Sequence, residues 1–286
     1  MGVLGPDDLV FNSVPVSHIP LFDRLDAVRA AGFKGISIAV GDYFASRDAG
    51  VSAAEIRMRI DDAGLEVAEL ESVGHWLRNH NEGVGPYAAF LKDLTVERMA
   101  GIASELGARS LLVIEMAGVT VDMESAGDDF ATLCDVAADH GLIAHLECLL
   151  FGGIPDLAAA WQIVRAADRP NGKVTIDAWH LFRGGSTLSE LAAIPGHFIG
   201  TVQLCDALRT AQPDALAETM TARLLPGEGE LDLVGMVRTL DAIGSTAPIG
   251  VEVFNHNLAD QSMTTIAQNW ADAARATLAQ ARAINA

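Results

Sequence analysis

Residues 139–153, DHGLIAHLECLLFGG, contain the unit from which this chain is built. A helical pattern ends at a glycine, a short apolar run follows, and two glycines close it. Gly141 suits the left-handed conformation that ends many helices, so it indicates a helix turning into a strand. Alternate strand residues face the same side, so His145 and Glu147 are expected to point one way and Cys148 the other. The stretch therefore predicts a buried strand with ionisable groups on one face.

The same unit recurs along the chain, with glycine also in the helix-to-strand turns at 30–35, 62–66 and 105–109. Strands are expected at 9–16, 35–40, 65–73, 110–115, 142–150, 173–181, 200–206 and 249–255. Helices are expected at 21–31, 52–63, 88–106, 124–140, 156–168, 187–194, 231–243 and 260–284. Eight β units, each followed by a helix, predict an α/β fold: a single (β/α)8 TIM barrel domain over residues 1–286. An open doubly wound sheet is the alternative, but the first unit lacks the glycine-rich turn GxGxxG.

Composition excludes several classes of function. The 286 residues are 50% hydrophobic, and 38 acidic against 19 basic residues give a net charge of −19. Such a charge opposes binding to nucleic acid and to anionic membranes. We find no basic segment followed by a long apolar one at the N-terminus and no uncharged apolar run of spanning length, so neither a signal peptide nor a membrane span is expected. Three cysteines without a CxxC motif argue against a disulfide framework or a zinc ribbon, and the cytoplasm is the expected location.

Polar residues lie near the ends of the last four expected strands, namely Glu147, Asp177, Gln203 and Glu252. The carboxyl ends of the strands carry the active site in barrels of this kind. A single acid there is often a helix N-cap or a surface group, but three buried carboxylates facing one another without Lys or Arg would repel strongly. One divalent metal ion would relieve that repulsion. Oxygen ligands favour Mn²⁺ or Mg²⁺, with Co²⁺ or Zn²⁺ as alternatives.

Several neighbours of this set are candidates for substrate contacts. His180 follows Asp177 by three residues and is expected either to bind a substrate oxygen or to orient a ligand, with a solvent-exposed loop histidine as the alternative. His145 lies deeper than Glu147 and is expected to support or pack rather than to bind the metal. Asp206 follows the seventh strand, and the long segment 207–230 after it is either a contact element or an insertion.

The third expected strand ends near His75 and Trp76, and both are candidates for binding substrate. Trp76 is a candidate for stacking on a sugar face, or else packs within its loop. No glycine-rich loop with a nearby lysine is present, so an unphosphorylated substrate is expected.

The strings VTIDAWHL, QLCDA, PGEGEL and EVFN resemble the xylose isomerase-like barrels of the sugar phosphate isomerase/epimerase superfamily, most closely over residues 143–256. The resemblance implies that Glu147, Asp177, Gln203 and Glu252 hold the metal, and that His180 and Arg223 touch substrate. It also implies that Glu147 and Glu252 move protons. Sugar epimerases usually carry histidine where this chain has Gln203, and the QLCDA, PGEGEL and EVFN strings together are closer to the 3-dehydroshikimate dehydratase branch. That branch needs a basic residue for a carboxylate, for which Arg78 is the candidate.

The expected activity is isomerisation or epimerisation of a small polyhydroxylated keto substrate by proton abstraction next to its carbonyl, through an enediolate. A dehydratase of the 3-dehydroshikimate or inosose type is the first alternative. A non-catalytic accessory subunit is the second. The apolar stripe within 264–285 suits either a homo-oligomer contact or packing onto the barrel.

Overall fold

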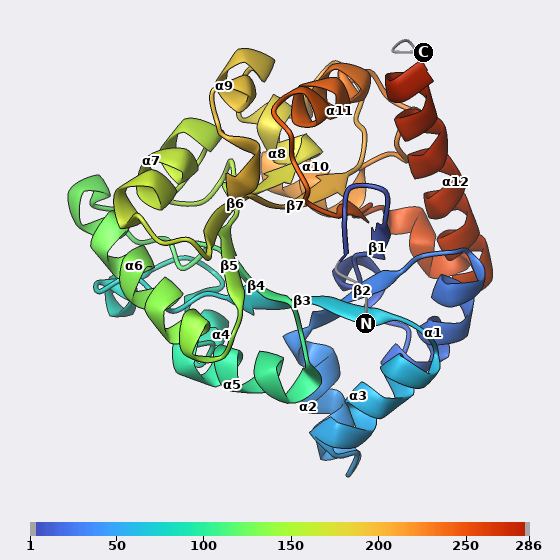
Figure 1. Cartoon of the computed structure of the whole chain (residues 1–286), viewed down its shortest axis with the longest axis horizontal. Coiled ribbons are helices and arrows are strands. Elements are labelled where there is room, and N and C mark those ends of the chain that lie inside the picture. The colour runs from blue at the N-terminus through green and yellow to red at the C-terminus, as the bar shows by residue number, and fades with distance from the viewer. Residues whose placement is uncertain (1–3, 284–286) are drawn as a thin grey trace.

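The computed structural model describes residues 4–283, in which the parallel strands close into a barrel in the order β1 to β8 (Figure 1). Each strand pairs with its sequence neighbours, and β8 pairs with β1. The expected (β/α)8 barrel is therefore confirmed. The strands are β1 (Leu9–Phe11), β2 (Gly35–Ala39), β3 (Glu66–Val73), β4 (Ser110–Val113), β5 (Ile143–Leu146), β6 (Gly172–Asp177), β7 (Ile199–Leu204) and β8 (Ile249–Val251).

Helices surround the barrel (Figure 1). The helices of eight residues or more are α1 (Leu21–Ala30), α2 (Val40–Asp48), α3 (Ala53–Asp62), α5 (Val96–Leu106), α6 (Met123–Asp139), α7 (Leu157–Ala167), α11 (Leu233–Ala242) and α12 (Met263–Arg282). Shorter helices are α4 (Ala88–Leu91), α8 (Ala178–Arg183), α9 (Leu188–Ala192) and α10 (Ala215–Thr221). No helix within residues 4–283 combines the length and the apolar composition that crossing a membrane requires.

The glycine turns behave as the sequence indicates. Gly32, Gly64, Gly107 and Gly141 all have positive φ, between 67° and 85°. Other residue types rarely adopt this conformation without strain. These turns end the helices and return the chain to the amino end of the next strand.

Several expected elements differ from the structure, among them the strand expected at 173–181, which ends at Asp177 where α8 begins. The single helix expected at 88–106 is divided into α4 and α5, because Thr95 is extended and its side chain accepts a hydrogen bond from the Arg98 amide as a new N-cap. The expected strands at 9–16 and 142–150 end early, at Phe11 and Leu146, where the chain turns into the loops above the barrel. Residue 284, the last of the expected helix 260–284, lies outside the described residues.

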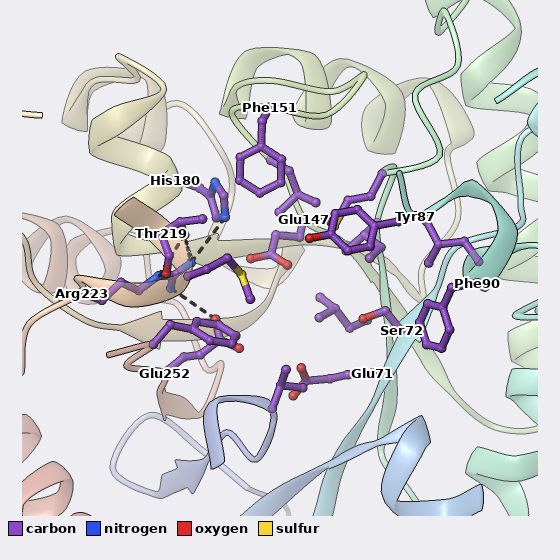
Figure 2. Close-up of a pocket in the computed structure, with 18 residues that line it drawn as sticks. Glu71, Ser72, Tyr87, Phe90, Glu147, Phe151, His180, Thr219, Arg223 and Glu252 are labelled. Carbon is purple, nitrogen blue, oxygen red and sulfur yellow. Dashed lines mark hydrogen bonds and ion pairs between the residues drawn. The ribbon is translucent and has the colours of Figure 1, made fainter. Parts of the chain in front are cut away.

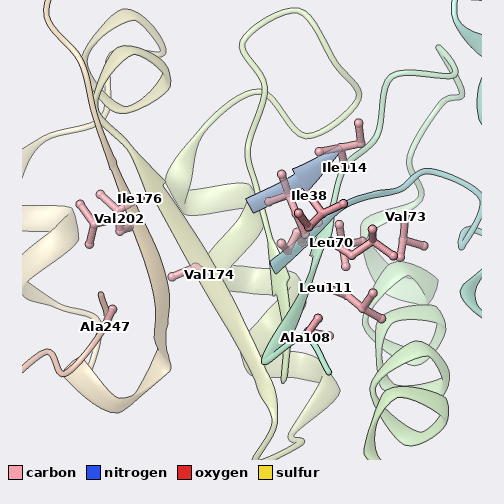
Figure 3. Packing of buried hydrophobic residues seen from close by; sticks show 14 of the residues in the cluster. Ile38, Leu70, Val73, Ala108, Leu111, Ile114, Val174, Ile176, Val202 and Ala247 are labelled. Carbon is pink, nitrogen blue, oxygen red and sulfur yellow. The ribbon is translucent and has the colours of Figure 1, made fainter. Parts of the chain in front are cut away.

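Strand residues alternate between the barrel interior and the surrounding helices. Leu70 and Ile176 belong to the buried hydrophobic cluster drawn in Figure 3, while their neighbours Glu69 and Asp177 carry the polar groups of the interior. This alternation follows from the two-residue period of a strand. It provides an apolar layer for helix packing and leaves the interior face free for polar groups.

His145 is one of these interior groups. Its Nδ1 lies 2.8 Å from the Thr175 hydroxyl, and its Nε2 lies 3.0 Å from the Ser110 hydroxyl and 3.2 Å from a Glu69 oxygen. The ring is fully buried between β3, β4 and β6. Both ring nitrogens are therefore engaged below the barrel mouth, in keeping with a supporting role for this histidine.

Candidate active site

A cavity of about 230 Å³ opens where the strands end. Glu147 follows β5 and Glu252 follows β8, and both side chains point into it (Figure 2). Its polar wall also contains His180 and Arg223. The remaining lining is mostly apolar or aromatic, with Val14, Glu71, Ser72, Tyr87, Phe90, Leu91, Leu112, Ile114, Met116, Leu149, Phe151, Thr219, Met220 and Phe254.

Asp177 and Gln203 lie side by side beneath the polar wall. They are register partners in the β6–β7 ladder, and both side chains are buried. The Oδ1 atom of Asp177 accepts a hydrogen bond from the His180 amide at 2.8 Å and so caps α8. Asp177 is therefore a helix N-cap, one of the alternatives for an acid at a strand end. This hydrogen bond uses only one of its two carboxylate oxygens.

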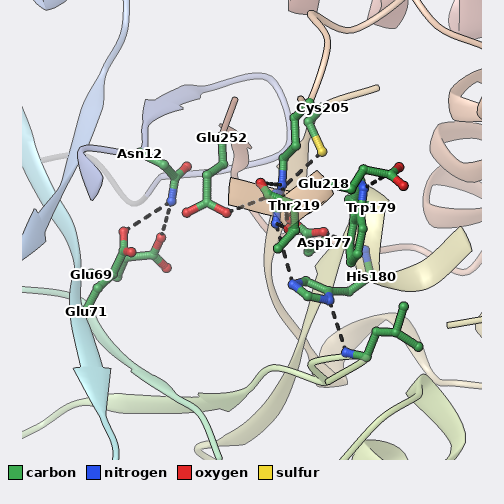
Figure 4. Close-up of polar contacts among 12 residues, drawn as sticks. Asn12, Glu69, Glu71, Asp177, Trp179, His180, Cys205, Glu218, Thr219 and Glu252 are labelled. Carbon is green, nitrogen blue, oxygen red and sulfur yellow. Dashed lines mark hydrogen bonds and ion pairs between the residues drawn. The ribbon is translucent and has the colours of Figure 1, made fainter. Parts of the chain in front are cut away.

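Arg223 joins the carboxylates from the other side (Figure 4). Its Nη1 lies 2.7 Å from Asp177 Oδ2 and 3.3 Å from Glu252 Oε2, and its Nη2 donates to the Thr219 hydroxyl at 2.8 Å. Burial works against the charge of Arg223, but the surrounding anionic groups, Asp177 foremost, raise its pKa. The guanidinium is thus a permanent cation at the edge of the acidic group, so the expectation that these carboxylates face one another without Lys or Arg is wrong.

Burial dominates the electrostatics of the two cavity glutamates. It raises the pKa of Glu147 well above its ordinary value, and the charges of Asp177 and Glu252 raise it further. Burial also raises the pKa of Glu252, although Arg223 opposes that shift. Both carboxylates are therefore costly to ionise without a further cation.

His180 presents a neutral ring to the cavity. Burial lowers its pKa to about 4, and Arg223 lowers it further against the opposing effect of Asp177. The Leu150 amide donates to Nδ1 at 3.3 Å, so a neutral ring that keeps this hydrogen bond carries its proton on Nε2. In that form Nε2 can donate a hydrogen bond to a substrate oxygen, since the Arg223 guanidinium 3.5 Å away offers no acceptor.

The donor set fits a divalent cation. One ligand atom each from Glu147, Asp177 and His180 lie within 4.8 Å of one another. Within the described residues, neither Oε1 nor Nε2 of Gln203 has a hydrogen-bond partner, although the side chain is fully buried. A buried amide without partners is unfavourable, whereas an amide oxygen is an ordinary ligand for a hard cation. Together with Glu252, these side chains offer oxygen-rich coordination.

Three of the residues expected to touch substrate are absent from the cavity lining of the described chain. Asp206 accepts hydrogen bonds from the amides of Ala207, Gly227 and Leu231 and so holds the turn at 225–231 in place. Each of these amides would be left without its acceptor if Asp206 turned toward substrate. The side chain of Asp206 is therefore committed to this turn.

Trp76 and His75 also have other partners. The indole of Trp76 is buried against Phe130 and donates to the Ile114 carbonyl at 2.9 Å. His75 stacks on His80, with ring centroids 4.0 Å apart, and its Nδ1 lies 2.7 Å from the Lys92 carbonyl. Packing, rather than stacking on a sugar, accounts for both positions.

Glu71 is a cavity residue that our sequence analysis missed. It follows Glu69 on the inward face of β3, and the Asn12 amide donates to Glu69 at 2.8 Å and to Glu71 at 3.4 Å (Figure 4). Burial, with the charge of Glu69, raises the pKa of Glu71 to about 8. The signal was present in EVAELESV, where glutamates two residues apart sit in an apolar strand. Tyr87 and Phe90 come from the long β3–α5 connection, whose sequence gives no such signal.

The segment 207–230 forms part of the cavity wall. It contains α10 and contributes Thr219, Met220 and Arg223 to the lining. Glu218 anchors it, because its carboxylate accepts hydrogen bonds from the Trp179 indole, the Arg183 guanidinium and the Gln212 amide. The segment is therefore a contact element, held against α8.

Several known proteins resemble this chain in sequence or in structure. A 3-dehydroshikimate dehydratase of Pseudomonas aeruginosa is 30% identical over 237 residues, which cover 82% of this chain and 36% of that protein. A solved fusion of a xylose isomerase-like TIM barrel with a 4-hydroxyphenylpyruvate dioxygenase superposes with a TM-score of 0.84 at 25% identity, over 98% of this chain and 44% of the other. This chain thus spans about a third of that dehydratase and less than half of the fusion protein.

The IolI protein, solved with a bound zinc atom, has a TM-score of 0.82 at 18% identity, over 96% of this chain and 98% of its own. Residues 25–283 match the family described as xylose isomerase-like TIM barrel. That match includes all four expected metal ligands. The chain therefore belongs to the xylose isomerase-like TIM barrel family.

Proposed function

We propose that this protein is a divalent-metal-dependent enzyme that removes a proton next to the carbonyl of a small, unphosphorylated, polyhydroxylated keto substrate. Isomerisation or epimerisation is the proposed outcome, and the cytoplasm, which suits three free buried thiols, is the proposed location. The observation that carries the proposal is that ligand atoms of Glu147, Asp177 and His180 lie within 4.8 Å of one another, while Gln203, the register partner of Asp177, has a fully buried amide without a hydrogen-bond partner in the described chain.

Glu147, Asp177, Gln203 and Glu252 would hold the cation, with Mn²⁺ or Mg²⁺ preferred for oxygen ligands and Co²⁺ or Zn²⁺ as alternatives. When bound, it would draw electron density from the carbonyl oxygen and so favour formation of the enediolate. Arg223 would then be free to contact a substrate oxygen, because the cation would take over part of its neutralising role. His180 would donate from Nε2 to another oxygen.

The proton is assigned to Glu147 and Glu252. Burial raises the pKa of both carboxyls, so each can hold a proton between its removal and its return. One carboxylate removes the proton, and either one returns it. Return to the same carbon from the opposite face gives an epimer, and return to the neighbouring carbon gives the aldose or ketose isomer.

Dehydration is the second candidate, because the Pseudomonas dehydratase aligns with most of this chain. The same proton removal would then be followed by loss of a β-hydroxyl as water, with one carboxylic acid supplying the proton. Arg78, the candidate partner for a substrate carboxylate, gives no support to this outcome. Its side chain is more than half exposed, pairs with Asp129 and is absent from the cavity lining of the described chain.

Hydrogen exchange in D₂O tests the proposal. Protein supplied with Mn²⁺ is incubated with ketoses, inososes and 3-dehydroshikimate, and deuterium incorporation is followed by NMR. Exchange is expected at the carbon beside the carbonyl of at least one neutral keto-polyol, and it should be lost in Glu252→Gln. Formation of protocatechuate from 3-dehydroshikimate would favour the dehydratase. A chain that retains no stoichiometric metal and exchanges no probe would be an accessory subunit instead.

A further inference from the structure

Glu71 is a further polar group of the cavity lining, besides Glu147, His180, Arg223 and Glu252. In Figure 2, Glu71 lies across the open space from Phe151 and His180, on the side of β3, and its charge helps to raise the pKa of Glu252. A substrate held between Glu147 and Glu252 by its carbonyl would present a further group to Glu71.

Glu71 has hydrogen-bond donors but no cationic partner. The residue is only 5% exposed, and its carboxylate accepts hydrogen bonds from the Ser37 side chain and, at 3.4 Å, from the Asn12 amide, which lies closer to Glu69. No Lys, Arg or His nitrogen of the described residues lies within ion-pairing distance of Glu71, whereas Glu69 has His145 at 3.2 Å. A buried acid with so little compensation is costly to the fold and is better explained by a ligand that it contacts.

The charges of the cavity lining limit what that ligand can be. Arg223 is the only Lys or Arg in the lining of the described chain, and it already pairs with Asp177 and Glu252. A carboxylate or phosphate near Glu71 would therefore meet a carboxyl and no cation. A hydroxyl, by contrast, can donate a hydrogen bond to Glu71.

We infer that Glu71 is a specificity-determining residue that binds a hydroxyl of an uncharged substrate and, in its ionised form, disfavours substrates that carry an anionic group at this position. The inference rests on the proposed function and narrows its substrate class to neutral keto-polyols. Ser72 lines the cavity next to Glu71 and offers a second hydrogen-bonding group. Tyr87 and Phe90 close the same side with ring faces and edges suited to the C–H surface of a polyol (Figure 2).

Matched probes test this inference by binding. The Mn²⁺-loaded chain is titrated calorimetrically, at a pH of about 9 where Glu71 is ionised, with D-fructose and with D-fructuronate, which has a carboxylate in place of one CH₂OH group. The ring pair scyllo-inosose and 3-dehydroshikimate is titrated in the same way. The wild type should bind the neutral member of a pair about tenfold or more tightly, as expected for a hydrogen bond to a charged group.

Glu71→Gln keeps the shape and removes the charge, so it should lower that preference by about tenfold, weakening the neutral probe and strengthening the anionic one. Glu69→Gln is the matched control, because it removes the same charge from the same strand outside the cavity lining, and should change the preference by less than about threefold. Should Glu71→Gln fail to fold, the wild-type preference is decisive, since tighter binding of the anionic probes overturns the inference.

Equal effects of Glu69→Gln and Glu71→Gln would also overturn it, and so would failure of all four probes to bind. The proposed function fails separately, when no probe exchanges hydrogen in the presence of Mn²⁺. Exchange on an anionic probe bound more tightly than its neutral partner would leave the function standing and remove only the role given to Glu71.

Discussion

Substitution of Gln203 gives a sharp test of the proposed metal site. Its amide is buried without partners in the described chain, so it destabilises the fold unless a ligand engages it. Gln203→Met should therefore stabilise the metal-free protein by about 1–3 kcal/mol, because the unsatisfied polar atoms are removed at similar volume. The same variant should lose most of the rise in melting temperature that Mn²⁺ gives the wild type. Differential scanning calorimetry with and without Mn²⁺ measures both effects.

Gln203→His is the control, since histidine is also a metal ligand and should keep the response to Mn²⁺. A Gln203→Met variant that responds to Mn²⁺ as the wild type does would remove Gln203 from the metal site.

Glu71 should make the stability of the protein depend on pH. Its pKa rises from 4.5 to about 8 on folding, so between these values the folded chain retains a proton that the unfolded chain has released. Stability is therefore lost as the pH rises through this window, by roughly 1.4 kcal/mol per pH unit for one fully buried group. Glu71→Gln should flatten the decline between about pH 5 and 8 in urea unfolding of the metal-free protein. An unchanged slope would contradict the assignment.

At the scale of single residues, the signal in the sequence was a polar side chain within an otherwise apolar strand. Glu147, Asp177 and Glu252 stand out because each interrupts an apolar strand, and all three converge in the structure. Asp206 gives the same signal, yet its partners are three backbone amides of a turn. The position of that turn cannot be predicted from the pattern of the strands. Trp76 is similar, because an aromatic residue after a strand predicts neither the direction of its ring nor its partner.

At the scale of elements, the segment 207–230 shapes the cavity through a single anchor. Glu218 is buried and binds Trp179, Arg183 and the Gln212 amide, while Thr219 and Arg223 of the same segment line the site. Glu218→Ala should loosen the segment, so the KM for the substrate should rise and amide hydrogen exchange across 212–223 should accelerate. The change is local, because the strands beneath pack independently of this carboxylate.

Glu230→Ala is the matched control in that segment, since Glu230 is half exposed and pairs with the exposed Arg209. It should leave both the KM and the exchange rates close to those of the wild type. Equal effects of the two substitutions would mean that α10 is held by packing alone.

The periodicity of the apolar residues predicts whether an element is a helix or a strand. It predicts less well where each element begins and ends. The glycines before β2, β3, β4 and β5 mark helix ends because each needs a positive φ. The break between α4 and α5 was missed, since Thr95 acts through one hydrogen bond to the Arg98 amide within an otherwise helical pattern. The segment 207–230 was identified by its length, but its contact with the site depends on tertiary ion pairs.

At the scale of the whole molecule, binding of a metal ion should raise the free energy of unfolding. Without a cation, the burial of Glu147 and Glu252 raises the pKa of both above the ordinary 4.5, so the stripped protein should lose stability as the pH rises above that value. Mn²⁺ at a concentration of about 100 times its Kd should restore roughly 2.7 kcal/mol. Thermal unfolding of stripped and reloaded protein between about pH 6 and 9 measures this, and identical curves would contradict it.

The overall fold was the most predictable level, because eight repeats of one β–turn–helix unit leave few ways to bury eight apolar strands. The substrate was the least predictable. The cavity that would hold it is lined by residues of β3, β4 and α8, by residues that follow β1, β5 and β8, and by the segments 74–95 and 207–230, which meet only in the closed barrel.

In the proposed function, proton removal beside a carbonyl depends on a cation held by Glu147, Asp177, Gln203 and Glu252. Its most direct test is the rate at which scyllo-inosose, or another neutral keto-polyol that the wild type accepts, exchanges its α-hydrogen in D₂O. That rate should fall to background in chelator-stripped protein, return on addition of Mn²⁺, and stay at background when Asp177→Asn is reloaded. Full exchange by the stripped wild type would contradict the account.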